Sequence, residues 1–117
     1  MSKFAFAATM AVAMADSGFF AKTPYKRFAK LMDKYGFSWE PVEVTTDDGH
    51  ILTTFHVTGN SQGPFSPSKP PVLIMHGDES DGAEWLSMYK EGLPMHLQLA
   101  EAGYDVWIGN NRGTEYS

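Results

Sequence analysis

Two short polar loops, each directly after an apolar run, are the places where this sequence is able to carry chemistry. His76-Gly77-Asp78-Glu79 follows residues 71–75, and Asn110-Asn111-Arg112-Gly113 follows residues 104–109. A His-Gly pair after a strand permits a sharp turn whose backbone N–H groups face a cavity, and acyl-transfer enzymes build part of an oxyanion hole in this way. An ordinary structural turn is the competing interpretation of the pair.

His76 and Arg112 have the widest chemical range of the side chains in these loops. We interpret His76 as an orienting or packed residue rather than a general base, because no activated nucleophile accompanies it. Arg112 is able to hold a carboxylate or a phosphate, yet we favour a structural ion pair or a clamp on backbone carbonyls. We also expect no Gly-x-Ser-x-Gly frame in this chain, and therefore no serine nucleophile of that type.

The sequence has no pattern typical of a metal or cofactor site. Its histidines lack the spacing of metal ligands, cysteine is absent, and no Gly-rich phosphate loop occurs. Four acidic residues after the His-Gly pair are spaced unlike an EF-hand, so we interpret them as a solvated loop. These residues are Asp78, Glu79, Asp81 and Glu84. We expect neither a metal nor a cofactor.

Periodicity and turn residues predict the elements that precede these loops. A helix is predicted from residue 24 to about residue 35, with Thr23 as its cap, Pro24 in its first position and Gly36 after its end. We interpret its basic residues as a solvated face. Alternating residues 39–46 and 51–57, separated by Asp47-Asp48-Gly49-His50, predict an antiparallel hairpin.

The second half of the chain has the pattern of a βαβ unit. After a predicted surface loop at residues 59–70, the continuous apolar run 71–75 predicts a strand buried on both faces. A helix at about residues 93–102 and a strand at residues 104–109 follow, so the two strands should be parallel. The fold class is therefore α/β, a hairpin leading into a parallel unit of an incomplete sheet, and ligands should bind beyond the strand ends.

Composition excludes some classes of protein. The net charge is −5 without basic clusters, which argues against nucleic-acid binding. Residues 1–15 have one early cation, an apolar run and Ala13-Met14-Ala15, so we predict a signal peptide cleaved before Asp16. A buried N-terminal helix is the alternative. Residues 16–117 then form one segment of a domain, since α/β enzymes usually need about 200–250 residues.

Several stretches between about residues 35 and 117 resemble the acid lipases, the family that includes gastric lipase and lysosomal acid lipase. The matching stretches are VEVTTDDGHIL at residues 42–52, PVLIMHG at residues 71–77, Trp85, and LAEAGYDVWIGNNRG at residues 99–113. The last of these is the most specific. The resemblance implies an α/β-hydrolase fold, a secreted or lysosomal location, and hydrolysis of neutral lipid esters such as triacylglycerols or sterol esters by a Ser-His-Asp triad.

The same resemblance implies roles for individual positions. The backbone N–H of Asp78 would be one oxyanion donor, although the family usually has a leucine there and a carboxylate opposes a developing oxyanion. Met75 also replaces a glutamine common in the family.

We expect the triad and the lid beyond Ser117. The chain is then a fragment, the product of a truncated gene model, or one chain of a nicked enzyme whose remainder forms a second chain. The final parallel strand would then be an exposed apolar edge. Contact with a lipid surface is possible in the complete enzyme. The alternative is a non-catalytic truncated homologue that binds a lipid or a protein partner.

Overall fold

The computed structural model describes residues 24–117, and the predicted signal peptide lies outside these residues. The described elements follow one another along the chain as α3 (Lys26–Tyr35), β1 (Phe37–Thr45), β2 (Ile51–Asn60), β3 (Gly63–Pro64), β4 (Lys69–Ile74), α4 (Glu84–Ser87), α5 (Met95–Glu101) and β5 (Tyr104–Ile108). No helix among these residues is both long and apolar enough to cross a bilayer.

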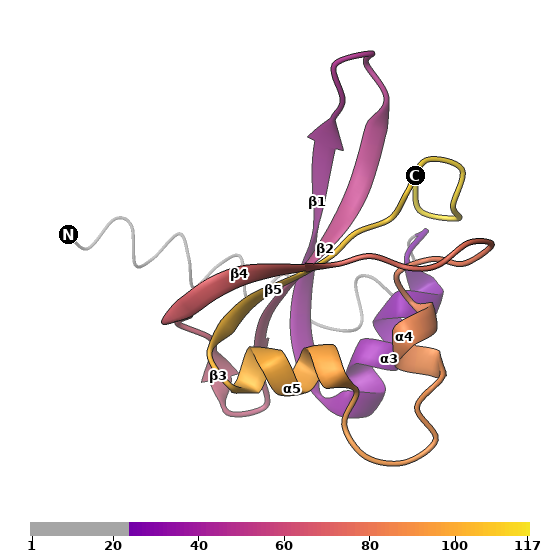
Figure 1. Ribbon diagram of the computed structural model, residues 1–117. Coiled ribbons are helices and arrows are strands. Elements are labelled where there is room, and N and C mark those ends of the chain that lie inside the picture. Colours follow the sequence, from indigo (N-terminus) through magenta and orange to yellow (C-terminus); the bar gives the residue numbers. More distant parts are fainter. Residues whose placement is uncertain (1–23) are drawn as a thin grey trace.

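The strands form one mixed sheet in the order β1-β2-β5-β4, with β3 paired to β2. The hairpin strands β1 and β2 are antiparallel, and β4 and β5 are parallel with α5 between them in the chain. The two halves meet where β2 runs antiparallel to β5, with Phe55 opposite Ile108. Figure 1 shows the hairpin tip projecting beyond the rest of the sheet. The predicted α/β class, the hairpin and the parallel βαβ unit are confirmed.

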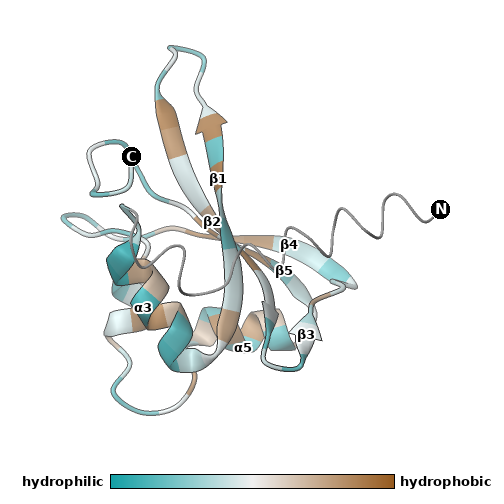
Figure 2. Ribbon diagram, turned by 180° about the vertical axis from the view of Figure 1, so that it is seen from behind, coloured by the Kyte–Doolittle hydropathy of each residue, from teal (hydrophilic) through white to brown (hydrophobic). Residues whose placement is uncertain are grey.

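Helix α3 ends as predicted and begins differently. Gly36 adopts a left-handed conformation with φ of 73°, and its N–H donates to the last carbonyls of the helix. The helix begins at Lys26 after Tyr25, which makes no side-chain cap, so Pro24 is not its first residue. The predicted cap Thr23 lies outside the described residues. Hydrophilic and hydrophobic residues alternate along α3 (Figure 2), as one buried face requires.

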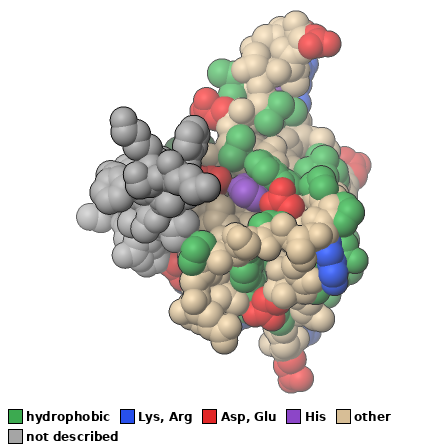
Figure 3. Space-filling model, turned by 90° about the vertical axis from the view of Figure 1, so that its left-hand side faces the viewer, with side chains coloured by type: hydrophobic (Ala, Val, Ile, Leu, Met, Phe, Trp, Pro, Cys, Tyr) green, Lys and Arg blue, Asp and Glu red, His purple; other side chains and the backbone are tan. Residues whose placement is uncertain are grey.

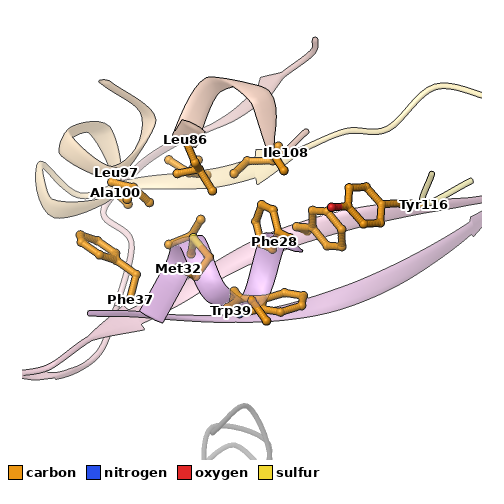
Figure 4. Packing of buried hydrophobic residues seen from close by; sticks show 14 residues of the cluster. Phe28, Met32, Phe37, Trp39, Leu86, Leu97, Ala100, Ile108 and Tyr116 are labelled. Atoms are coloured by element: carbon orange, nitrogen blue, oxygen red, sulfur yellow. The ribbon is translucent and has the colours of Figure 1, made fainter. Parts of the chain in front are cut away.

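The hydrophobic core lies between the three helices and one face of the sheet, called here the inner face. The Phe28 ring of α3 stacks on Phe55 at a centroid distance of 3.9 Å and meets Trp39 edge-on at 4.7 Å. Figure 4 shows Leu86 and Ile108 directed toward this aromatic group. All of these side chains are almost fully buried. Each is worth roughly 2–3 kcal/mol relative to exposure, so this packing fixes α3 and the βαβ unit on the same side of the hairpin.

Strand β4 is less buried than the sequence predicts. Leu73 is 62% exposed and Met75 is 40% exposed, and none of the residues of β4 is fully buried. β4 is also the edge of the described sheet, whereas β5 lies between β2 and β4. The predictions that β4 is buried on both faces and that the last parallel strand is the edge are therefore wrong.

The predicted loop at residues 59–70 is also shorter than expected. β2 continues to Asn60, a tight turn leads into β3, and β4 already begins at Lys69. Gly59 permits this turn, because a Cβ at this position would lie 2.6 Å from the carbonyl oxygen of Gly63. Helix α5 is also shorter than predicted, because it spans Met95–Glu101 rather than residues 93–102.

Candidate active site

The two polar loops lie side by side at the carboxyl ends of β4 and β5. Together they line an open cavity of about 700 Å³, whose wall includes His76, Gly77, Asp78, Asn111, Arg112 and Gly113. The parallel strands are responsible, because their carboxyl ends leave the same edge of the sheet. The sequence therefore places both loops correctly, and their separation of more than thirty residues in the chain is closed by the βαβ unit.

His76 joins the two loops through both ring nitrogens. Its Nε2 accepts a hydrogen bond of 3.0 Å from the backbone N–H of Asn111, and its Nδ1 lies 2.7 Å from the carbonyl oxygen of Gly77. An Nε2 that accepts from an amide carries no proton, so Nδ1 is the donor to Gly77 and the imidazole is neutral. With both nitrogens engaged, His76 orients the loops and has no nitrogen left to accept a proton from a nucleophile.

Asp78 follows this turn with its side chain held by its own loop. One carboxylate oxygen accepts the backbone N–H of Glu79 at 3.1 Å, while Ser80 Oγ donates to the carbonyl of Gly77. Glu79 has φ of 54°, the one positive value among the described non-glycine residues. The backbone N–H of Asp78 has no hydrogen-bond acceptor among residues 24–117. It is thus available at the cavity wall.

Asn110 supports the cavity from below. The residue is 2% exposed; its Nδ2 donates to the carbonyl of Thr53 at 2.8 Å, and its Oδ1 accepts the N–H of Gly82 at 2.8 Å. A Cβ at Gly82 would lie 2.8 Å from the Ile108 side chain, so only glycine allows this approach. One buried amide therefore fixes the acidic loop against β2 and the end of β5.

Arg112 forms a surface ion pair with the tip of the hairpin. Its Nη2 lies 2.8 Å from both carboxylate oxygens of Asp48, and both side chains are more than half exposed. A hydrogen bond from the Thr46 hydroxyl and the guanidinium of Arg112 lower the pKa of Asp48 below its ordinary value. This geometry matches the structural ion pair favoured from the sequence. Gly113 follows with φ of 87° and turns the chain.

The acidic loop is only partly solvated. Asp81 is 8% exposed and accepts a hydrogen bond of 2.9 Å from Arg27 of α3, while its other oxygen accepts the N–H of Ala83 at 2.8 Å. Glu84 begins helix α4, which the sequence analysis did not predict. The interpretation of all four acids as a solvated loop is thus wrong for Asp81, and Arg27 is not simply part of a solvated basic face. Arg27 and Asp81 are 54 positions apart, so no local signal indicates their pairing.

One Gly-x-Ser-x-Gly frame does occur, at Gly59-Asn60-Ser61-Gln62-Gly63, contrary to the expectation from the sequence. A nucleophile elbow needs a strand-to-helix turn, whereas Ser61 lies in the turn between β2 and β3. Its side chain is exposed, and the cavity beside it is lined by Asn60, Gln62, Gly63, Pro64, Phe65 and Glu101 without a histidine. Both glycines serve the hairpin turn, and no histidine of residues 24–117 lines the cavity beside Ser61.

Metal-binding geometry is not found in this part of the chain. Among residues 24–117, no three His, Cys, Asp or Glu side chains are arranged to hold an ion. His56 instead bridges Glu40 at 3.0 Å and Asp105 at 2.7 Å, and its ring stacks on Trp107. Asp105 is partly buried, which opposes ionisation, but hydrogen bonds from Trp107 and His56 lower its pKa overall.

Residues 28–89 match the family described as the partial alpha/beta-hydrolase lipase region. Human "Lipase member N" is 40% identical over 83 residues, which cover 70% of this chain and 21% of that protein. "Lipase 3" of Drosophila melanogaster is 35% identical over 94 residues, covering 80% of this chain and 24% of that protein. Rat "Gastric triacylglycerol lipase" is 30% identical over 90 residues, covering 76% of this chain and 22% of that protein.

The chain spans no more than about a quarter of the length of these relatives. The family match covers more than half of the chain and includes the hairpin, β4 and the His-Gly turn. This chain therefore belongs to the α/β-hydrolase lipases.

Proposed function

We propose that this chain is the N-terminal segment of a secreted or lysosomal lipase that hydrolyses neutral lipid esters, triacylglycerols or sterol esters, and whose Ser-His-Asp triad is contributed by residues outside this chain. The observation that carries the proposal is the His76 bridge, which joins the loops after β4 and β5 into one cavity wall. Membership of the lipase family supports the reaction class. Without an elbow serine or a free histidine base, the described residues contribute binding and electrostatics rather than nucleophilic attack.

The backbone N–H of Asp78 is the proposed oxyanion donor. It is unengaged and follows the turn that His76 holds, so it is available to a carbonyl oxygen as negative charge develops there. The carboxylate would oppose that charge if it faced the same point. Its hydrogen bond to Glu79 holds it within its own loop and reduces this opposition.

The charge of the cavity favours an uncharged substrate. Four acids line it, Asp78, Glu79, Asp81 and Glu115, of which Asp81 is paired with Arg27 of α3. The guanidinium in the lining, Arg112, is itself paired with Asp48. An anionic phospholipid would approach like charges, which is unfavourable even when solvent screens them. A triacylglycerol or sterol ester carries no charge and meets no such penalty.

The first experiment identifies the native product. Intact mass under denaturing conditions and sequencing of the transcript past Ser117 determine whether the segment is expressed within a longer lipase. That product is then assayed on triacylglycerol emulsion, sterol ester and anionic phospholipid vesicles, with hydrolysis expected on the first two. A native product of 117 residues or fewer without hydrolysis would favour a non-catalytic homologue that binds a lipid or protein partner.

Substitutions at Asp78 test the oxyanion role in that product. Asp78→Pro removes the backbone N–H, and we expect kcat to fall about 10²–10³-fold with little change in KM. Asp78→Asn keeps the N–H and removes the charge, so kcat should rise. Ser61→Ala is the control for the hairpin serine and should leave kcat and KM unchanged. Equal kcat for Asp78→Pro and the parent, with matched thermal midpoints, would exclude the role.

A further inference from the structure

The proposed oxyanion donor lies in a loop with little internal support. Residues 76–82, called here the donor loop, run from the end of β4 toward α4, and residues 77–79 are exposed. The Glu79 N–H donates to the carboxylate of Asp78. The Ser80 hydroxyl donates to the carbonyl of Gly77. Both bonds lie within the loop, so they shape it without fixing its position relative to the sheet.

Two successive residues after β5 hold the ends of the donor loop. At its start, the N–H of Asn111 donates to His76 Nε2 at 3.0 Å. At its end, the N–H of Gly82 donates to Asn110 Oδ1 at 2.8 Å. The first contact is made by a backbone group and the second by a buried side chain. The position of the loop end therefore depends on the identity of residue 110.

Asn110 is itself held by the hairpin. Its Nδ2 donates to the carbonyl of Thr53 in β2 at 2.8 Å, and the N–H of Thr53 donates to Ser117 Oγ at 2.9 Å. In the described sheet, β2 pairs with β5 only at Phe55 and His56, and beyond this pairing the hairpin projects from the body of the molecule (Figure 3). At Thr53, the side chains of Asn110 and Ser117 thus take the place of a pairing strand.

The two partners of Asn110 require an amide in one orientation. The N–H of Gly82 needs an oxygen, whereas the carbonyl of Thr53 needs a donor. Turning the amide over would place two donors together on one side and two acceptors on the other. Asn110 is 2% exposed, so a lost contact leaves a buried backbone group without a partner. The amide therefore fixes the end of the donor loop relative to β2.

We infer that Asn110 is a positioning residue for ester hydrolysis, which holds the donor loop so that the Asp78 N–H faces the developing oxyanion. The inference rests on the proposed function, because it takes Asp78 as the donor. Such a donor is effective only when it is already in place, and a displacement of about 1 Å can lower the rate about 10²-fold. Asn110 does not line the cavity, so its effect passes through Gly82.

Hydrogen exchange in the 117-residue chain tests whether Asn110 holds the loop. The exchange rate of the Gly82 amide is divided by that of the buried Leu97 amide of α5, so that global unfolding cancels. Asn110→Ala should raise this ratio about tenfold or more, because the Gly82 N–H loses its acceptor. Met32→Ala is the control, because it opens a cavity under α3 and destabilises the chain away from the loop. Its ratio should equal that of the parent.

Kinetics of the native lipase test the effect on catalysis. At a temperature where all variants are folded, Asn110→Ala should lower kcat about 10²-fold with little change in KM. Met32→Ala should change neither constant. In the Asp78→Pro background the donor N–H is absent, so Asn110→Ala should lower kcat no further. A side chain that only stabilised the fold would not depend on Asp78 in this way.

Asn110→Asp is the conservative variant. A protonated carboxyl has an O–H donor and an acceptor oxygen close to the positions of the amide groups, so it can contact both Thr53 and Gly82. An ionised carboxyl donates nothing to Thr53 and places a charge in a buried site. Relative to the parent at each pH, kcat of Asn110→Asp should approach the parent value in acid and fall as the introduced carboxyl ionises.

Any of three results would overturn the inference. The first is a Gly82 exchange ratio that Asn110→Ala leaves unchanged, as expected if the pair of Arg27 and Asp81 alone held this end of the loop. The others are an unchanged kcat and an additive loss in the Asp78→Pro background. An active lipase whose Asn110→Ala variant keeps its kcat leaves the proposed function standing. A native product that hydrolyses no ester removes the proposed function and with it the role of Asn110 in catalysis, even where the exchange ratio responds.

Discussion

Acidification is expected to destabilise the folded chain through His96. This residue lies on α5, is 1% exposed, and its Nε2 has no hydrogen-bond partner in the described structure. Burial lowers its pKa from the ordinary 6.5 to about 4, because the charged imidazolium loses its hydration. The unfolded chain therefore binds a proton in a pH range where the folded chain does not.

The sign and size of the effect follow from that difference. A pKa lowered in the folded state gives stability that is complete above pH 6.5, falls as the pH drops, and is lost by about pH 4. The loss amounts to about 3 kcal/mol, because each pKa unit is worth about 1.4 kcal/mol. Domains of this size have about 5–15 kcal/mol in total, so the loss is a substantial fraction.

Urea unfolding of the chain, followed by tryptophan fluorescence at several pH values across this window, measures the effect. His96→Leu removes the titrating group and the unpaired nitrogen. Between pH 6.5 and about pH 4, the free energy of unfolding of this variant should therefore fall by about 3 kcal/mol less than that of the parent. Met95→Leu, at the exposed neighbouring position of α5, should follow the parent. Carboxylates titrate equally in all three chains and cancel in the difference. Parallel curves for His96→Leu and the parent would refute the reasoning.

Three further substitutions have defined outcomes. Asn110→Ala leaves the N–H of Gly82 and a carbonyl of β2 without partners, so urea unfolding should show a loss of about 2–4 kcal/mol. Gly82→Ala forces a Cβ to within 2.8 Å of Ile108, and calorimetry should show a destabilisation of roughly 1–3 kcal/mol. Arg112→Gln removes an exposed ion pair, so the thermal midpoint should hardly change, while NMR titration should show the pKa of Asp48 rising toward 3.8. A large drop in the midpoint with an unmoved Asp48 pKa would contradict that assignment.

The sequence predicts those features that depend on neighbouring residues. Alternation around Asp48-Gly49 specifies the hairpin, and Gly36 ends α3, because turn and cap geometry are set within a few residues. Each of the two polar loops directly follows an apolar run, which is also a local signal. The sequence therefore predicts where the cavity wall lies, but not which residues hold it in place.

Features that depend on distant segments were not predictable. Leu73 lies in an apolar run and is exposed, because burial of a strand depends on what covers it and not on its own composition. In the sequence, Asp81 looks like one of several surface acids. Its burial depends on Arg27 of α3, which is distant in the chain. The Gly-x-Ser-x-Gly frame around Ser61 is the opposite case, a local pattern that suggests a site where there is none. The pattern marks a nucleophile only at a strand-to-helix turn, and here the turn joins two strands.

The amide of Asn110 has a consequence for the order of folding. Its two hydrogen bonds connect residues 28 and 57 positions apart in the chain, so they form only after the hairpin, the acidic loop and the end of β5 have come together. Closing such long loops lowers the entropy of the chain before the hydrogen bonds form and contribute favourable energy. The hydrogen bonds of Asn110 should therefore form after the folding transition state. Removing them should accelerate unfolding and leave the rate of folding nearly unchanged.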